Sequence, residues 1–228
     1  MTRWLMPFAA LAGSLVGGGT VYALGTRSSG EMVRTYLLAH PEVITEAMDQ
    51  LRLRESGQAV AALRPMLEKP YASAIAGNPR GDVTVVEFFD YNCTYCRASL
   101  PTIARLIASD PKVRVVFREL PILAESSRTA ARASMAAARQ GKFTAFHDSL
   151  YAQGPVTDAT IATAAKKAGV TLANLDERAA DAEIGRNYAL AGKLGLTGTP
   201  AWVIGNRVLS GAQPLDQLQA AIAEARAS

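Results

Sequence analysis

Val83-Thr-Val-Val-Glu-Phe-Phe-Asp-Tyr-Asn-Cys-Thr-Tyr-Cys96 is the stretch of sequence that decides the fold. Its first part, Val83–Asp90, is an apolar run of the kind that forms a buried strand. It ends in a C-x-x-C pair, Cys93 and Cys96, which holds the only two cysteines among the 228 residues. The next segment, Arg97–Ile107, has helical spacing. The pair is therefore expected at a strand-to-helix corner, with Cys93 close to the helix N-terminus.

This position favours redox chemistry at the pair. Unpaired backbone N–H groups and the positive end of the helix dipole stabilise a thiolate at Cys93. A thiolate is the species that attacks disulfides. The spacing then lets Cys96 return along the same helical turn and close a small disulfide.

Two other interpretations of the pair are less favoured. A four-coordinate zinc site needs two further ligands, and the chain offers only His40 and His147, far apart in the sequence. A purely structural disulfide across so short a loop restrains the unfolded chain little, because stabilisation grows with loop length. No metal is therefore expected.

The bulk properties fit one domain of ordinary size plus extensions. The formal net charge is +4, and the excess is mostly scattered arginine. The sequence has no run of like charges and no basic stripe with interleaved aromatic residues, so nucleic-acid binding is not indicated.

Residues 1–25 differ from the rest of the chain. Arg3 is the only charged residue before Arg27, and the segment between them is apolar. This is typical of a secretory signal peptide, or of an uncleaved membrane anchor, since about 20 apolar residues span a bilayer. Val21-Tyr22-Ala23 is a passable cleavage site. Both a signal peptide and an anchor predict a periplasmic or other extracytoplasmic protein. In such a compartment, disulfide exchange is the expected use of a C-x-x-C pair.

Residues 26–70 are predicted to form a helical extension. Pro41 stops a first short helix and can open a second. An apolar stripe recurs at helical spacing: Val33, Leu37, Val43, Ile44, Ala47, Met48 and Leu51. Such a stripe needs a partner surface, which is either the protein's own domain or other copies of the chain. Pro65 and Pro70 then predict a linker over residues 63–71.

Residues 71–228 are predicted to form the main domain. A second apolar strand is expected at 112–120, and a helical block at about 126–194. A strand hairpin follows at 201–204 and 207–210, and an amphipathic helix closes the chain. This order predicts an α/β protein with a thioredoxin fold, a helical insertion after the second strand, and C-x-x-C where that fold carries its active site.

At this level the chain resembles the DsbA-like thiol–disulfide oxidoreductases, and more narrowly the ScsC-like group of exported proteins. The resemblance covers about residues 31–226. The matching stretches are Val86–Cys96, Phe117-Arg-Glu-Leu-Pro-Ile-Leu123, Gly195-Leu-Thr-Gly-Thr-Pro-Ala201 and Tyr36-Leu-Leu-Ala-His-Pro-Glu-Val-Ile44.

The resemblance implies a role for each residue of the site. Cys93 would be the attacking, partly exposed thiol, and Cys96 the buried resolving one. Pro200 would be a cis proline facing the sulfurs, with Thr199 before it, and the backbone there could pair with an extended substrate chain. An ordinary trans turn is the alternative. Glu87 would be a buried acid that assists proton transfer, unless it is an edge residue in water.

Thr94 and Tyr95 fill the variable dipeptide between the cysteines. The family often has Pro or Gly first, and Thr94 departs from that, which leaves the redox potential open. Thr199 and the N-terminal extension favour isomerase or reductase use, whereas the DsbA-like scaffold favours oxidase use.

The leading hypothesis is an exported protein thiol–disulfide oxidoreductase. Its expected partners are exported client proteins with thiols or disulfides, and a membrane redox partner that reoxidises or reduces the pair. The extension predicts a homo-oligomer, with a trimer favoured by the resemblance. No metal or organic cofactor is implied. The alternatives are a non-enzymatic thioredoxin-fold chaperone or adaptor, and a copper(I)-binding module that uses the two thiolates.

Overall fold

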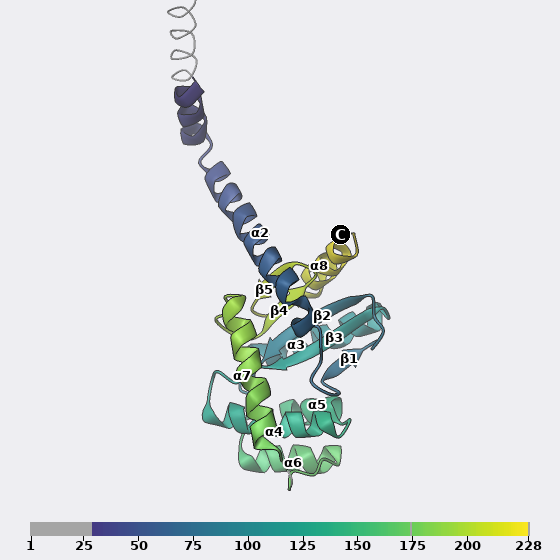
Figure 1. The fold of residues 1–228 in the computed structure, drawn as a ribbon. Coiled ribbons are helices and arrows are strands. Elements are labelled where there is room, and N and C mark those ends of the chain that lie inside the picture. Colours follow the sequence, from purple (N-terminus) through teal and green to yellow (C-terminus); the bar gives the residue numbers. More distant parts are fainter. Residues whose placement is uncertain (1–28, 174, 228) are drawn as a thin grey trace, which may run out of the picture. The chain divides into compact units, whose positions relative to one another are not determined.

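A computed structural model describes residues 29–173 and 175–227. The predicted signal or anchor segment, residues 1–25, lies outside them. Residues 29–39 are helical. The remaining elements, in chain order, are α2 (Glu42–Leu67), β1 (Ile75–Gly77), β2 (Val83–Phe89), α3 (Thr94–Ser109), β3 (Val113–Glu119), α4 (Glu125–Arg139), α5 (Phe143–Gln153), α6 (Asp158–Ala168), α7 (Glu177–Lys193), β4 (Ala201–Ile204), β5 (Arg207–Ser210) and α8 (Leu215–Ala227) (Figure 1).

The strands form one mixed five-stranded sheet in the order β1-β3-β2-β4-β5. The central strand β2 pairs parallel with β3 and antiparallel with β4, so it is hydrogen-bonded on both sides. All seven residues of β2 are buried, as the continuous apolar run predicted. The antiparallel hairpin β4–β5 has the predicted bounds. The thioredoxin fold with a helical insertion is confirmed.

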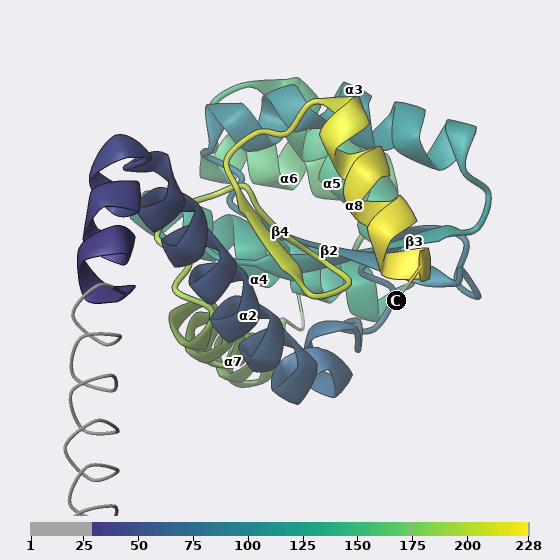
Figure 2. The same cartoon turned by 90° about the horizontal axis from the view of Figure 1, so that it is seen from above.

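Helices cover both faces of this sheet. Alternate residues of a strand point to opposite faces. The odd-numbered residues Val85 and Phe89 of β2 belong to one core with α3 and α8. The even-numbered Val86 and Phe88 belong to a second core with α7 and the end of α2. Figure 2 shows α3 and α8 on one side of the sheet and α7 on the other.

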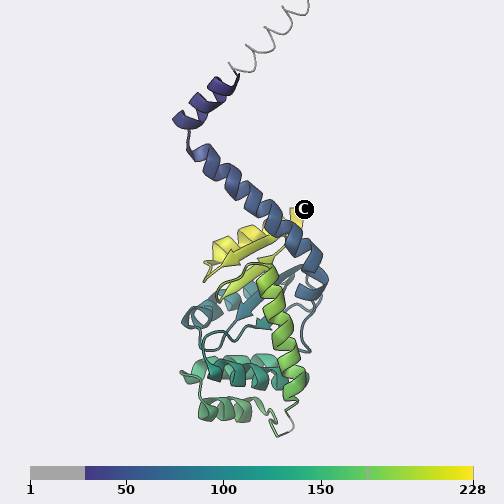
Figure 3. The ribbon, with the colours of Figure 1, turned by 60° about the vertical axis from the view of Figure 1, so that its left-hand side comes forward.

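The helical insertion lies between β3 and β4. It comprises α4, α5, α6 and α7, at nearly the positions that the alanine-rich sequence predicted. The first three pack on one another below the sheet in the view of Figure 1, and α7 runs from this group along the sheet (Figure 3). Residues 131, 135, 180 and 184 form a small separate core between α4 and α7.

The linker predicted over residues 63–71 is wrong for its first half. Helix α2 continues through Pro65 to Leu67, and both Leu63 and Leu67 are buried against the sheet. Arg118 of β3 completes this end of the helix. Its guanidinium donates to the carbonyl oxygens of Met66, Leu67 and Lys69, with Nε 3.0 Å from the Leu67 oxygen.

Strand β1 was also not predicted. It is only three residues long and pairs antiparallel with β3, Ala76 lying opposite Val115. Its residues Ile-Ala-Gly carry neither an alternating pattern nor a β-branched run. Only Ile75 resembles a strand residue, so the sequence gives no strand signal here.

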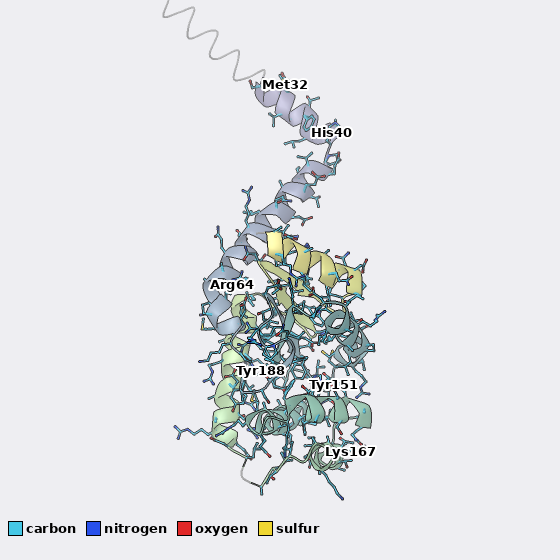
Figure 4. All side chains as sticks on the ribbon, turned by 90° about the vertical axis from the view of Figure 1, so that its right-hand side faces the viewer. Met32, His40, Arg64, Tyr151, Lys167 and Tyr188 are labelled. Atoms are coloured by element: carbon cyan, nitrogen blue, oxygen red, sulfur yellow. The ribbon has the colours of Figure 1, made fainter. Side chains whose placement is uncertain are left out.

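The chain divides into two compact units, residues 1–52 and 53–228. The described part of the first unit, residues 29–52, consists of helix with a break at His40 and Pro41. Figure 4 labels Met32 in its first helical segment and His40 at the break. Most of its large apolar side chains are exposed: Met32, Val33, Tyr36, Leu38, Ile44, Met48 and Leu51.

Candidate active site

The cysteine pair lies at the corner that the sequence predicted. Strand β2 ends at Phe89, and helix α3 begins at Thr94. Cys93 is the N-cap residue of α3, and its backbone N–H donates to the Asp90 carbonyl oxygen at 3.0 Å. Its sulfur accepts a hydrogen bond from the backbone N–H of Cys96 at 3.3 Å. An N-cap residue with sulfur in the accepting position is well placed to carry negative charge.

The expectation that Cys93 is partly exposed is wrong. Both cysteines are free thiols, and Cys93 is only 5% exposed. Its sulfur faces the chain rather than water, because the thiol donates a hydrogen bond to the carbonyl oxygen of Thr199 at 3.1 Å. A substrate sulfur therefore has to approach beside the Thr199 backbone.

Cys96 and Glu87 lie deeper in the protein. Cys96 is 1% exposed, and burial raises the pKa of its thiol far above the usual range, with the charge of Glu87 as the next cause. Glu87 is fully buried on the face of β2 that packs against α3. Burial raises the pKa of the Glu87 carboxyl well above its usual value, and negative charge on Cys93 raises it further. The three groups are thus electrostatically coupled.

The remaining predicted residues lie between the two cysteines or at the Thr199–Pro200 bond. Thr94 and Tyr95 are exposed on the first turn of α3. The Thr199–Pro200 peptide bond is cis. The Thr199 hydroxyl oxygen is buried without a hydrogen-bond partner in the described structure, although its carbonyl receives the Cys93 thiol. All seven predicted site residues therefore lie in β2, at the start of α3, or just before β4.

Two polar residues of the corner were not predicted. Asp90 is 1% exposed, and its carboxylate accepts hydrogen bonds from the backbone N–H groups of Asn92, Ile122 and Leu123. Asn92 donates from its amide to the hydroxyls of Ser126 and Ser127. Their signal in the sequence is position alone: both stand between a buried strand and the C-x-x-C pair.

Nothing in the described part of the chain gathers metal ligands. Residues 29–173 and 175–227 contain no group of three His, Cys, Asp or Glu side chains placed to hold an ion. His147 is buried on α5 among aromatic rings, with the ring centroid of Phe117 at 4.9 Å and that of Tyr151 at 5.0 Å. Burial lowers the pKa of its imidazole, which is typical of a core histidine.

Two family descriptions match the sequence. The family described as "DSBA-like thioredoxin domain" matches residues 84–223, which include the whole site. The family described as "Copper resistance protein ScsC N-terminal domain" matches residues 30–58, at the exposed helices. The predicted resemblance to both groups is confirmed.

Solved structures agree with these matches. A thioredoxin-like oxidoreductase from Silicibacter pomeroyi DSS-3 is 42% identical, with a TM-score of 0.67 over 71% of this chain and 96% of that one. A periplasmic thioredoxin-like protein from Salmonella enterica serovar Typhimurium is 36% identical, with a TM-score of 0.68 over 73% and 97%. Proteus mirabilis ScsC in a transitional conformation is 30% identical, with a TM-score of 0.68 over 90% and 98%.

Curated relatives are longer proteins. The Na(+)/H(+) antiporter NhaA 3 of Salinispora tropica is 31% identical over 166 residues, which make up 70% of this chain and 26% of the relative. NhaA 1 of Salinispora arenicola is 30% identical, over 68% of this chain and 25% of its own. The chain thus spans about a quarter of the length of the curated relatives it matches. Among the described residues, no helix is both long and apolar enough to cross a membrane.

Proposed function

This chain belongs to the DSBA-like thioredoxin domain family of thiol–disulfide oxidoreductases, and on that premise we propose that it exchanges disulfides with protein clients through Cys93 and Cys96. The observation that carries the proposal is the asymmetry of the two thiols. Cys93 caps a helix with its sulfur beside the Thr199 backbone, whereas Cys96 is buried next to a carboxyl group. An attacking thiol needs a position that stabilises its thiolate, and a resolving thiol has to stay protonated until the mixed disulfide has formed.

In the reductive direction, the Cys93 thiolate attacks one sulfur of a client disulfide. The client S–S bond breaks, its second sulfur leaves as a thiolate that takes up a proton, and a mixed disulfide forms. Cys96 then loses its proton and attacks the Cys93 sulfur. The client leaves with both of its sulfurs reduced, and Cys93 and Cys96 are joined. The oxidative direction is the same sequence in reverse.

Glu87 is the group we assign to the Cys96 proton. The Cys96 thiol ionises reluctantly because it is buried, so the second step needs a base inside the protein. Glu87 is close enough for its charge to act on Cys96. Burial raises the pKa of Glu87 well above its usual value, so its carboxylate is a stronger base than that of an exposed glutamate.

We further propose that the protein works outside the cytoplasm. The apolar segment 1–25 and the C-x-x-C pair support this location, as does the likeness to a periplasmic thioredoxin-like protein. Its clients would be exported proteins with thiols or disulfides. Net oxidation or reduction of clients requires a redox partner, which we propose lies in the membrane, because the exchange itself neither creates nor removes electrons.

Self-association is the proposed role of residues 29–52. Seven large apolar side chains of this segment are exposed within the described chain, and a second and third copy would bury them. The match of residues 30–58 to the ScsC N-terminal domain supports this. Several active sites in one assembly would favour isomerase use, in which wrong disulfides are opened and re-formed.

Insulin reduction in the presence of dithiothreitol tests the proposal. The protein should accelerate the precipitation of insulin chains, and Cys93→Ser should abolish the acceleration. Cys96→Ser, reduced and then freed of dithiothreitol before it meets insulin, should instead accumulate a client–protein mixed disulfide on non-reducing gels. Acceleration that survives Cys93→Ser would exclude Cys93 as the attacking thiol. Reactivation of scrambled ribonuclease then separates isomerase from reductase use.

A further inference from the structure

Two apolar side chains are exposed on a loop that touches the active-site corner. Ile122 is 42% exposed and Leu123 is 54% exposed, in the segment between β3 and α4. The start of this loop is hydrogen-bonded to the active-site corner. The backbone N–H of Leu120 donates to the carbonyl oxygen of Phe89, the last residue of β2, at 2.8 Å.

Asp90 is the main link between this loop and the cysteines. One carboxylate oxygen, Oδ2, accepts from the backbone N–H groups of both Ile122 and Leu123, each at 2.9 Å. The other, Oδ1, accepts from the Asn92 N–H at 2.8 Å. The backbone carbonyl of the same residue accepts from the Cys93 N–H at 3.0 Å. One buried residue therefore orients both the attacking cysteine and the apolar loop.

The loop is held at its other points as well. The amide of Asn92 donates to the hydroxyls of Ser126 and Ser127, at 3.0 and 2.9 Å, where α4 begins. The hydroxyl of Tyr188, on α7, donates to the carbonyl oxygen of Pro121 at 2.5 Å. Tyr188 is itself partly exposed, and Figure 4 labels it on α7. The contacts fix the backbone and leave the Ile122 and Leu123 side chains in water.

A carboxylate is the group that this arrangement needs. It offers acceptors only, and three partly buried backbone N–H donors converge on it. An amide at the same place would direct N–H toward at least one of those donors. A smaller apolar side chain would leave the donors of residues 122 and 123 without a partner.

We propose that Asp90 is a positioning residue that holds Ile122 and Leu123 beside Cys93 as the apolar contact for an extended client segment. The inference rests on the proposed function, because the occupant is the client chain whose disulfide Cys93 attacks. A protein client, with apolar residues near its cysteines in the unfolded state, gains this contact. A small disulfide with no such residues does not. The loop therefore adds selectivity for protein substrates.

The test compares kcat/KM for insulin with kcat/KM for bis(2-hydroxyethyl) disulfide. The double variant Ile122→Ser/Leu123→Ser changes exposed side chains only, so it should fold. Its ratio of insulin to small-disulfide kcat/KM should fall about 5- to 10-fold, the loss typical of truncating contact residues at an interface. Asp90→Asn should lower the ratio in the same direction through an increase in KM for insulin. Met66→Ser, at a 50% exposed residue of α2, should leave the ratio unchanged.

An unchanged ratio in the double variant would overturn the inference, while insulin reduction by the wild type would keep the proposed function standing. If Asp90→Asn lowered kcat/KM equally for both substrates, Asp90 would act on the Cys93 sulfur and not on client binding, and the inference would also be wrong. If the wild type does not accelerate insulin reduction at all, the proposed function fails, and this inference fails with it.

Discussion

Three buried carboxyl groups near the active site differ in what surrounds them. Asp90 accepts three backbone hydrogen bonds, whereas burial is the largest influence on the pKa of both Glu87 and Glu119, and a hydrogen bond with Ser134 offsets part of it at Glu119. One oxygen of Glu119 has no hydrogen-bond partner within the described structure. Burial raises the pKa of both glutamates well above the usual value. Of the two glutamates, Glu87 is the one whose charge raises the pKa of the Cys96 thiol. Substitutions of the two glutamates can therefore be compared: both should affect stability, and only the one at Glu87 should affect the reaction of Cys96.

Glu87→Gln should slow resolution of the mixed disulfide. Removing a general base typically costs about 100-fold or more in the step that it serves. We expect a loss of that order in the Cys96 step at neutral pH, with the attack by Cys93 much less affected. Stopped-flow measurement of both steps checks this. Glu119→Gln is the control, and an equal loss in that variant would show that the effect is not specific to the residue beside Cys96.

Both substitutions should increase stability at neutral pH. Below about pH 4.5, the ordinary value for glutamate, each carboxyl is protonated in the folded and unfolded states alike. Above it the unfolded chain ionises first, because the folded pKa is raised. The folded state therefore loses about 1.4 kcal/mol per pH unit per carboxyl until the folded pKa is reached. Urea titrations at pH 4 and pH 7 should show the gain from Glu→Gln only at pH 7. A gain of equal size at both would contradict it.

At the scale of elements, the main difference from the sequence-based prediction is α2, which continues to Leu67 where a linker was expected. Its last turns are part of the catalytic unit: Leu67 is 1% exposed against the sheet. Leu67→Ala should lower the free energy of unfolding by about 2–5 kcal/mol, as expected for a buried leucine. Met66→Ala, at the neighbouring 50% exposed residue of the same helix, should change it by less than about 0.5 kcal/mol. Chemical denaturation followed by circular dichroism checks both. If both substitutions had the same small effect on the free energy of unfolding, the end of α2 would be a linker, as the sequence predicted.

Strong local patterns made most elements predictable. The apolar run of β2, the C-x-x-C corner and the β4–β5 hairpin follow from neighbouring residues alone. The errors have long-range causes. Pro65 is a helix breaker in isolation, but packing of Leu63 and Leu67 and the Arg118 hydrogen bonds retain the helix around it. The burial of Cys93 depends on Thr199, 106 residues away, and the role of Asp90 depends on a loop from another strand. No local pattern encodes such contacts.

At the scale of the whole molecule, the exposed helices of residues 29–52 predict self-association. By resemblance to the ScsC-like group, a form beginning at residue 26 should have about three times the mass of one chain by light scattering at micromolar concentration. Met32→Glu/Tyr36→Glu should reduce the mass to that of one chain, because it places charge among the exposed apolar side chains that self-association would bury. Arg34→Ser/Glu46→Ser, which alters exposed polar residues, should not. A single-chain mass for the wild type would remove the main support for isomerase use.

The burial of Cys96 also makes this protein sensitive to the acidity of its surroundings. In the reduced form the Cys96 thiol keeps its proton across the whole physiological range, because burial raises its pKa so far, and the disulfide holds no proton there. Closing the disulfide must then release at least one proton for every two electrons. The midpoint potential should therefore fall by at least about 30 mV for each unit of increasing pH. Equilibration with glutathione buffers between pH 5.5 and 8.5 measures this slope, and a flat profile would mean that Cys96 ionises in the reduced protein. As the medium acidifies, the same two sulfurs take electrons more readily, with no change in sequence or partner.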